Sequence, residues 1–204
     1  MAVTARLVVL ASGSGSNLQA LIDAAADGRL DARIVGVYVN RRNAYACTRA
    51  AEAGIACEFV PMGPFRERFD DPRAAREAYD ADLAGRVARH DPDAVVLAGW
   101  MHVFTASFLD RFPGRVVNLH PALPGAFPGA HAIDDAWEAH ERDGLDRTGV
   151  MVHLVPDEGV DDGPVLASRE VPILAGDDRT TLEERIHAVE HELLVETVAA
   201  FLAP

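Results

Sequence analysis

Lysine is absent from this chain, and all 19 of its basic residues are arginine. The absence excludes a P-loop lysine, a Schiff-base lysine and a lysine anchor for pyridoxal phosphate. Cys47 and Cys57 are the two cysteines, too few for a disulfide framework or a zinc site. Both lie in ordinary helix or strand patterns, which indicates reduced core thiols. No apolar run approaches the roughly 20 residues of a membrane span, and no signal-peptide pattern opens the chain, so we expect a cytoplasmic protein.

Positive charge is also scarce. Asp and Glu together number 32, and the net charge is −13 at pH 7. Broad nucleic-acid binding needs a basic face, so this balance argues against it. Any anionic ligand must be held locally, by backbone N–H groups or by a few arginines. With 204 residues, 49% of them hydrophobic, the chain suits one α/β domain with a sizeable core.

Apolar strand-like runs alternate with helical patterns from end to end. Strands are predicted over residues 6–11, 32–39, 57–60, 94–98, 115–119, 150–155 and 165–171, and helices over 17–26, 44–53, 73–90, 132–142 and 180–202. Residues 65–73 are polar and are predicted to form a mobile loop. The alternation favours parallel strands, whereas the last two strands are close enough in sequence to be antiparallel. We therefore expect a single-domain, Rossmann-like open twisted sheet, mostly parallel, with an antiparallel C-terminal part and helices on both faces.

A glycine-rich loop, Ser12–Asn17, connects the first predicted strand directly to a helix. Glycines let the backbone approach a ligand closely, and the N–H groups of a first helical turn attract phosphate. A dinucleotide site is disfavoured because Leu18 replaces the third glycine of G-x-G-x-x-G. In addition, the second strand ends in Asn40-Arg41-Arg42, with no acid for a ribose diol. The loop therefore favours a monophosphate, and a tight turn without a ligand is the alternative.

Residues suited to acyl transfer end the fifth predicted strand, in Asn118-Leu119-His120-Pro121, and Asp161 follows later in the chain. A carboxamide and an imidazole can stabilise an oxyanion, and an imidazole with a carboxylate can move a proton. Because ligands bind beyond the carboxyl ends of parallel strands, these residues should share an edge with the glycine-rich loop. A histidine at a strand end without any chemical role is the plainer interpretation.

The fourth strand ends in Gly99–Phe104 and should open on the same edge of the sheet. Met101, Val103 and Phe104 could form an apolar wall for a flat heterocycle. They could equally be core residues of the following turn.

Five motifs together resemble one family, the phosphoribosylglycinamide formyltransferases, over essentially the whole chain. They are Gly13–Ala20, Leu97–Met101, Asn118–Leu123, Phe127–His131 and Asp157–Pro164. The Asn-x-His-Pro and Asp-x-Gly-Pro pieces are shared by all formyltransferases that use formyltetrahydrofolate, whereas the Ser12–Asn17 loop points to this branch. The resemblance implies a purine-biosynthetic enzyme, monomeric or homodimeric, with a phosphate-binding half over about residues 1–115 and a catalytic and folate-loop half over about 116–204.

The resemblance also implies roles for particular residues. The catalytic residues would be Asn118, His120 and Asp161. The phosphorylated substrate would be bound by Gly15, Ser16, Asn17 and Glu190. The folate would be bound by Arg76, Met101, His102, Val103, Phe104 and Asn118.

The implied reaction is direct attack of the glycinamide ribonucleotide amine on the formyl carbon of 10-formyltetrahydrofolate. The Asn118 N–H₂ group and protonated His120 would stabilise the oxyanion. Asp161 would favour the imidazolium form of His120 and move the amine proton, through water, to the folate nitrogen. No metal is expected, because no Cys/His cluster has ligand spacing.

Three positions depart from the family pattern. His102 stands where an arginine or lysine is usual, which puts the role of its side chain in doubt. The segment Ala122–Gly125 reads Ala-Leu-Pro-Gly rather than Ser-Leu-Leu-Pro, and Asp162 adds a charge at a position that is more often small.

Other functions compete with the implied one. A formyltetrahydrofolate hydrolase shares the catalytic trio and uses water as acceptor, but that family usually carries an extra N-terminal regulatory domain. A sugar-nucleotide formyltransferase is disfavoured by the monophosphate character of the loop. A catalytically silent nucleotide-binding module is the alternative of another class, and the presence of all three trio residues argues against it.

Overall fold

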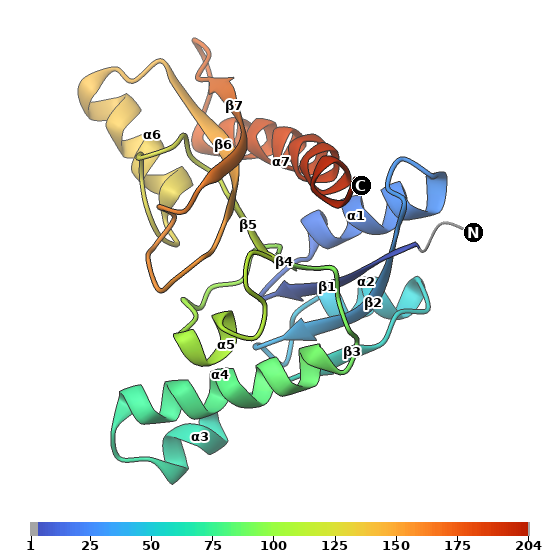
Figure 1. Ribbon diagram of the computed structural model, residues 1–204. Coiled ribbons are helices and arrows are strands. Elements are labelled where there is room, and N and C mark those ends of the chain that lie inside the picture. Colours follow the sequence, from blue (N-terminus) through green and yellow to red (C-terminus); the bar gives the residue numbers. More distant parts are fainter. Residues whose placement is uncertain (1–3, 204) are drawn as a thin grey trace.

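A sheet of seven strands, ordered β3-β2-β1-β4-β5-β6-β7, runs through the computed structural model, which describes residues 4–203 (Figure 1). The strands are β1 (Ala5–Ala11), β2 (Ala32–Val39), β3 (Cys57–Phe59), β4 (Ala94–Leu97), β5 (Val116–His120), β6 (Arg147–Leu154) and β7 (Val165–Pro172). The helices are α1 (Ser16–Asp27), α2 (Ala46–Glu52), α3 (Gly63–Arg68), α4 (Pro72–Ala88), α5 (Ala106–Leu109), α6 (Ala132–Asp143) and α7 (Arg179–Leu202).

The strand directions confirm the predicted architecture. Within the group of strands β1 to β5, all neighbouring strands pair in parallel. The β5–β6 and β6–β7 pairs are antiparallel. Every predicted strand is present with small shifts at its ends, the largest at β6, which begins at Arg147 rather than at residue 150. The chain leaves β1 toward β2 on one side and returns to β4 on the other, so the strand order reverses between β1 and β4. This reversal point is where open α/β sheets bind ligands.

Helices cover both faces of the sheet because the side chains of each buried strand alternate between them. On β1, Leu7 and Val9 pack against residues of α1, α2 and α7, whereas Val8 and Leu10 pack against α4 and α5. Figure 1 shows α1 and α7 on one side of the sheet and α4 on the other. Two hydrophobic cores result, one on each face, and together they fix the positions of the strand ends.

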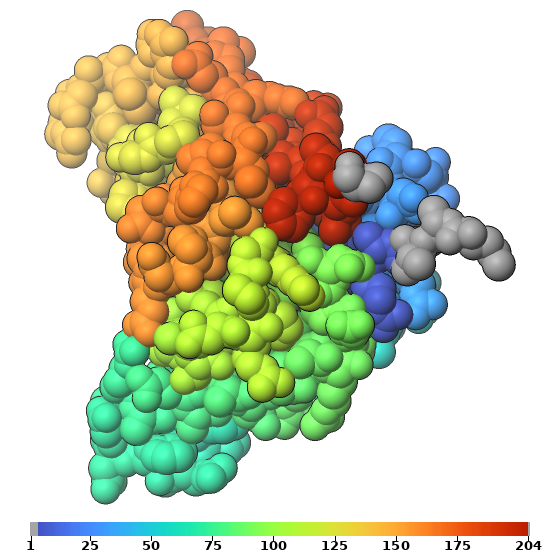
Figure 2. Space-filling view, in the orientation of Figure 1, coloured from blue at the N-terminus to red at the C-terminus, as the bar shows by residue number. Residues whose placement is uncertain are grey.

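Two short helices were not predicted. α3 occupies Gly63–Arg68 and α4 begins at Pro72, so the prediction of a loop over residues 65–73 is wrong for most of that segment. A six-residue helix is too short to show hydrophobic periodicity, and the Phe65 ring anchors it edge-on against Tyr79 of α4, with the ring centroids 5.4 Å apart. α5 is similarly short, and its backbone N–H at Ala106 donates to Glu158 in the loop between β6 and β7. Figure 2 shows these orange and yellow-green segments in contact.

The two cysteines form a disulfide, which corrects the expectation of reduced thiols. Cys47 lies on α2 and Cys57 begins β3, the next strand along the chain, and their Cα atoms are 5.4 Å apart. The short connection between the helix and the strand brings the two side chains together, a proximity that composition does not reveal. Of the helices in residues 4–203, none is both long and apolar enough to cross a membrane.

The glycine-rich loop turns sharply into α1 at Gly15, whose φ is +72°. A Cβ atom at Gly15 would lie 2.7 Å from the Cα atom of Ala46 at the start of α2. The Ala46 backbone N–H also donates to the Gly13 carbonyl, with an N–O distance of 3.2 Å. Gly15 is therefore required both for its left-handed backbone and for the close approach of α2.

Gly15→Ala should lower the free energy of unfolding by at least about 1–3 kcal/mol, the usual cost of a left-handed non-glycine backbone, before the contact with Ala46 is counted. Gly13→Ala is the matched control in the same loop, because a Cβ there meets no atom within 4 Å. We expect it to change stability by no more than about 1 kcal/mol. Urea unfolding of both variants is the measurement, and equal stabilities would contradict this account of Gly15.

Candidate active site

A cavity of about 440 Å³ opens at the carboxyl ends of β1, β4 and β5, where the strand order reverses. It is lined by residues from segments that are far apart in sequence: Ser12–Asn17, Leu97–Phe104, Asn118–Pro121, Gly129–Asp134, Gly159–Asp161 and one side of α7. The predicted phosphate loop, apolar wall and trio thus meet in one cavity. The volume lies within the usual range of small-molecule sites.

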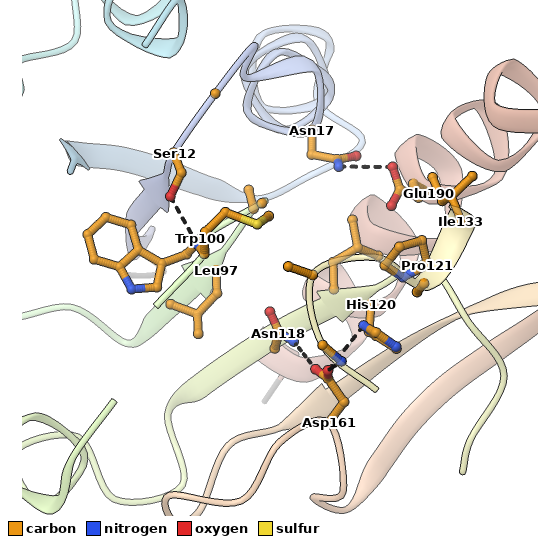
Figure 3. A pocket seen from close by; sticks show the side chains of 18 of the residues that line it. Ser12, Asn17, Leu97, Trp100, Asn118, His120, Pro121, Ile133, Asp161 and Glu190 are labelled. Atoms are coloured by element: carbon orange, nitrogen blue, oxygen red, sulfur yellow. Dashed lines mark hydrogen bonds and ion pairs between the residues drawn. The ribbon is translucent and has the colours of Figure 1, made fainter. Parts of the chain in front are cut away.

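The three predicted catalytic side chains converge on one wall of the cavity (Figure 3). Asn118 and His120 are two residues apart on β5. Because side chains along a strand alternate between the two faces, both point to the same face of the sheet. Asn118 Nδ2 donates to Asp161 Oδ1 at 3.0 Å, and His120 Nδ1 lies 3.3 Å from Asp161 Oδ2. The Gly129 backbone N–H donates to the same Oδ2 at 2.8 Å. The Asp161 carboxylate therefore connects β5 to the loop at Gly129 and to the loop that carries Asp161 itself.

Asp161 reaches this position with an uncommon backbone, φ +53°, which Asp tolerates better than most residues. Burial raises the pKa of its carboxyl group, but the neighbouring side chain of His153, the hydrogen bond from the Gly129 N–H and the charge of His120 together outweigh that effect. The net pKa of Asp161 is lowered, so the carboxylate is ionised at neutral pH. The site therefore contains a permanent negative charge at Asp161.

The loop that carries Asp161 is anchored from outside the cavity. Arg73 on α4 donates two hydrogen bonds to the Glu158 carboxylate, at 2.6 and 2.7 Å. Glu158 also accepts from the Ala106 N–H at 3.1 Å, which ties the loop to α5. A paired arginine and carboxylate in this two-bond geometry fixes orientation as well as distance.

Both ring nitrogens of His120 face acceptors. Nε2 donates to the Phe127 carbonyl oxygen at 2.9 Å, and Nδ1 faces the Asp161 carboxylate. An imidazole between two acceptors is best satisfied when both nitrogens carry hydrogens. The His120 ring is only 3% exposed, and Phe127 itself has an unusual φ of +44°. The loop after Pro121 thus bends so that a carbonyl meets the histidine.

Asn17 and Glu190 meet at the other end of the cavity. Asn17 Nδ2 on α1 donates to Glu190 Oε2 on α7 at 3.2 Å, across 173 residues of sequence. The structure adds His187, one turn earlier on α7, which sequence reasoning missed. Its Nδ1 lies 2.8 Å from Glu190 Oε2, and this hydrogen bond raises the His187 pKa. Its position three residues before Glu190 was the signal available in the sequence.

The predicted folate residues divide between the cavity and its surroundings. Met101 and Val103 are 46% and 49% exposed on the cavity wall, whereas Phe104, which also borders the cavity, is 2% exposed and stacks on Phe108 in the core. Arg76 is not among the cavity-lining residues. It is paired at 3.0 Å with buried Asp80 and donates to the Val103 carbonyl oxygen.

His102 differs from the other cavity residues in its electrostatics. Its ring packs edge-on against Trp100 and Tyr79. Burial, followed by the nearby charges of Arg76, Arg66 and Arg41, lowers its pKa from the ordinary 6.5 to about 4. His102 is therefore neutral at a position where the family resemblance led us to expect a cation.

His153 on β6 is a second residue that sequence reasoning missed. It pairs with Asn118 in the antiparallel register and is 2% exposed. The signal was available, because a histidine in a predicted strand next to β5 can face the trio. Among residues 4–203 there is no group of three or more His, Cys, Asp or Glu side chains placed to hold a metal ion.

Comparisons with known proteins agree with this geometry. A family model described as formyl transferase matches residues 5–198. Phosphoribosylglycinamide formyltransferase of Mycobacterium tuberculosis (H37Rv) is 49% identical over 197 residues, covering 96% of this chain and 84% of the relative. The Schizosaccharomyces pombe protein of the same name is 45% identical over 201 residues, 96% of each chain. A solved structure, glycinamide ribonucleotide transformylase 1 from Geobacillus kaustophilus, has a TM-score of 0.87 and 39% identity, covering 98% of this chain and 100% of that one.

The match over residues 5–198 means that the protein is an enzyme of the formyl transferase family. Within that family, identities of 45% and 49% over nearly the whole chain show that it belongs with the phosphoribosylglycinamide formyltransferases. The resemblance stated from the sequence motifs is confirmed.

The depressed pKa of His102 generates a stability prediction. Because the unfolded chain takes up a proton near pH 6.5 and the folded protein only near pH 4, this group lowers stability as the pH falls through that window. His102→Phe retains an aromatic ring and removes the titration. Urea unfolding between pH 7 and pH 4 should therefore show a smaller loss of stability for the variant than for the wild type. Parallel pH profiles would contradict the neutral, desolvated state of His102.

Proposed function

We propose that this enzyme transfers the formyl group of 10-formyltetrahydrofolate to the amine of 5′-phosphoribosylglycinamide. The observation that supports this most directly is the convergence of Asn118, His120 and Asp161 on a cavity whose far end is the glycine-rich loop. Such a cavity can hold a phosphorylated acceptor at one end and place its amine at the other. The two substrates are small molecules, and we propose a cytoplasmic enzyme that is monomeric or homodimeric.

The phosphate end uses backbone groups rather than a basic patch. Gly15 and Ser16 begin α1, where free N–H groups and the positive end of the helix dipole attract an anion. Asn17 and Glu190 close the cavity beside them and would hold the ribose hydroxyl groups. This arrangement suits a protein with a net charge of −13, because the phosphate is neutralised locally.

The folate end would use the wall formed by Met101, Val103 and the neutral ring of His102. Exposed apolar side chains at a cavity mouth suit a flat heterocycle. Phe104 and Arg76 would act from behind this wall. Arg76 supports it through the Val103 carbonyl group, and Phe104 does so through its stack on Phe108.

In the proposed reaction the amine lone pair forms a bond to the formyl carbon, and the formyl oxygen becomes an oxyanion. The tetrahedral intermediate then collapses and the bond to the folate nitrogen breaks, while the amine proton passes to that nitrogen. Asn118 and His120 would stabilise the oxyanion, and Asp161 would stabilise the imidazolium and transfer the proton.

The donors needed for this step are engaged by the protein itself. The Asn118 amide hydrogens face Asp161 and His153, and the His120 Nε2–H group faces the Phe127 carbonyl oxygen. Oxyanion binding therefore exchanges at least one of these contacts for a contact to substrate. The existing contacts hold these groups in position before the substrate arrives, and the exchange of one contact is the local rearrangement that the reaction requires.

The fate of a ¹³C-formyl label in 10-formyltetrahydrofolate tests the function. With phosphoribosylglycinamide present, NMR should show the label on the acceptor amine. With the dephosphorylated nucleoside at the same concentration, transfer should fall by at least about tenfold, because the phosphate contacts at α1 are lost. Labelled formate, formed equally with and without the acceptor, would instead indicate a hydrolase. Bound donor without turnover would indicate a silent binding protein.

The trio generates a kinetic prediction. Asn118→Ala, His120→Ala and Asp161→Asn should each lower kcat by at least about 10²-fold with much smaller effects on KM, because they act on charge that develops in the transition state. Thermal unfolding of each variant controls for misfolding. If Asp161 only shapes the loop turn, Asp161→Asn would keep a single-turnover rate like that of the wild type, and Asp161 would then have no role in the chemistry.

A further inference from the structure

His153 is a buried imidazole directly beside the trio, and the proposed reaction does not use it. Its Nε2 atom lies 3.1 Å from Asn118 Nδ2 and 3.4 Å from Asp161 Oδ1. On the other side of the ring, Nδ1 lies 2.8 Å from the Leu154 carbonyl oxygen. The side chain is 2% exposed, although it belongs to the residues that line the cavity.

The partners of the ring determine where its hydrogen lies. A carbonyl oxygen only accepts, so Nδ1 must carry the hydrogen and donate it to Leu154. An amide nitrogen only donates, so Nε2 accepts from Asn118. Both contacts are satisfied at once by a neutral His153 with its hydrogen on Nδ1. The 3.4 Å separation from Asp161 is longer than an ordinary hydrogen bond, so the contact with Asn118 is the stronger of the two at Nε2.

This arrangement also determines the orientation of the Asn118 carboxamide. One amide hydrogen points to His153 Nε2 and the other to Asp161 Oδ1. Figure 3 shows the contact with Asp161 and the amide oxygen of Asn118 pointing away from that carboxylate. A flipped amide would place its oxygen against a carboxylate and against an unprotonated ring nitrogen, and both contacts would be repulsive. His153 and Asp161 thus select the same orientation.

We propose that His153 is a positioning residue that fixes the orientation of the Asn118 carboxamide for formyl transfer, acting through its unprotonated Nε2 atom. The inference rests on the proposed function, because it assigns the consequence of this contact to the chemical step. With His153 removed, the amide would retain a single anchor and could rotate.

Two substitutions distinguish the roles of the two ring nitrogens of His153. In His153→Gln, the longer side chain places an amide oxygen near the original Nε2 position, where it can accept from Asn118. In His153→Asn, the shorter side chain places its amide nitrogen near the Nδ1 position, where it can donate to the Leu154 carbonyl oxygen. The first variant preserves the positioning contact, and the second preserves only the structural one.

We expect His153→Asn to lower kcat by about 10²-fold, the scale on which misplacement of a reacting group is felt. His153→Gln should stay within about tenfold of the wild type, and KM for both substrates should change by less than about threefold in either variant. Melting temperatures provide the control. Wild-type kcat in folded His153→Asn, or an equal loss in both variants, would overturn the proposal.

A measurement on the wild-type protein does not depend on how the variants fold. ¹⁵N NMR of the His153 ring should show a protonated Nδ1 and an unprotonated Nε2 at neutral pH. A hydrogen on Nε2 would overturn the proposal, because the ring could then no longer accept from Asn118. Failure of formyl transfer by the wild-type enzyme in the labelling assay would reject the proposed function separately, since the ring tautomer can be read without substrate.

Discussion

The carboxylate of Asp161 connects its own loop to three other segments of the chain, which are β5, the loop at Gly129 and β6. It accepts from Asn118 on β5, pairs with His120 on the same strand, accepts from the backbone of Gly129 and lies beside His153 on β6. A buried carboxylate without partners is very costly, and deleting one partner of a buried pair commonly costs about 3–5 kcal/mol. The site is therefore stable only when these contacts form together.

A second buried carboxylate, that of Asp80, organises the segment that follows the apolar wall in a similar way. Asp80 is completely buried and accepts from both the backbone N–H and the hydroxyl group of Thr105, while Arg76 pairs with its other oxygen. Burial nevertheless raises its pKa, because these contacts only partly compensate for desolvation. Asp80 thus fixes the segment that follows the apolar wall, whereas the ionised Asp161 faces the cavity. The two carboxylates differ in function because their surroundings differ.

Much of this structure follows from local sequence. Both the placement of Asn118 and His120 at the end of β5 and the glycine-rich turn into α1 were predicted. Each depends only on residues that are neighbours in the sequence. The proximity of Asp161 to His120 was implied by the family resemblance, whereas two other contacts between distant segments were not predicted. The Asn17–Glu190 pair and the His153–Asn118 pair depend on the packing of α7 on α1 and on the register of β6. The Cys47–Cys57 disulfide likewise needed the relative placement of α2 and β3.

The central claim is that Asp161, His120 and Asn118 act as one unit through the shared carboxylate. A double-mutant cycle on the single-turnover rate of formyl transfer, combining Asp161→Asn with His120→Ala, measures this most directly. The account predicts that the double variant is little slower than the slower single variant, because either change already disrupts the unit. Rate losses that multiply, with no coupling energy beyond about 0.5 kcal/mol, would contradict it.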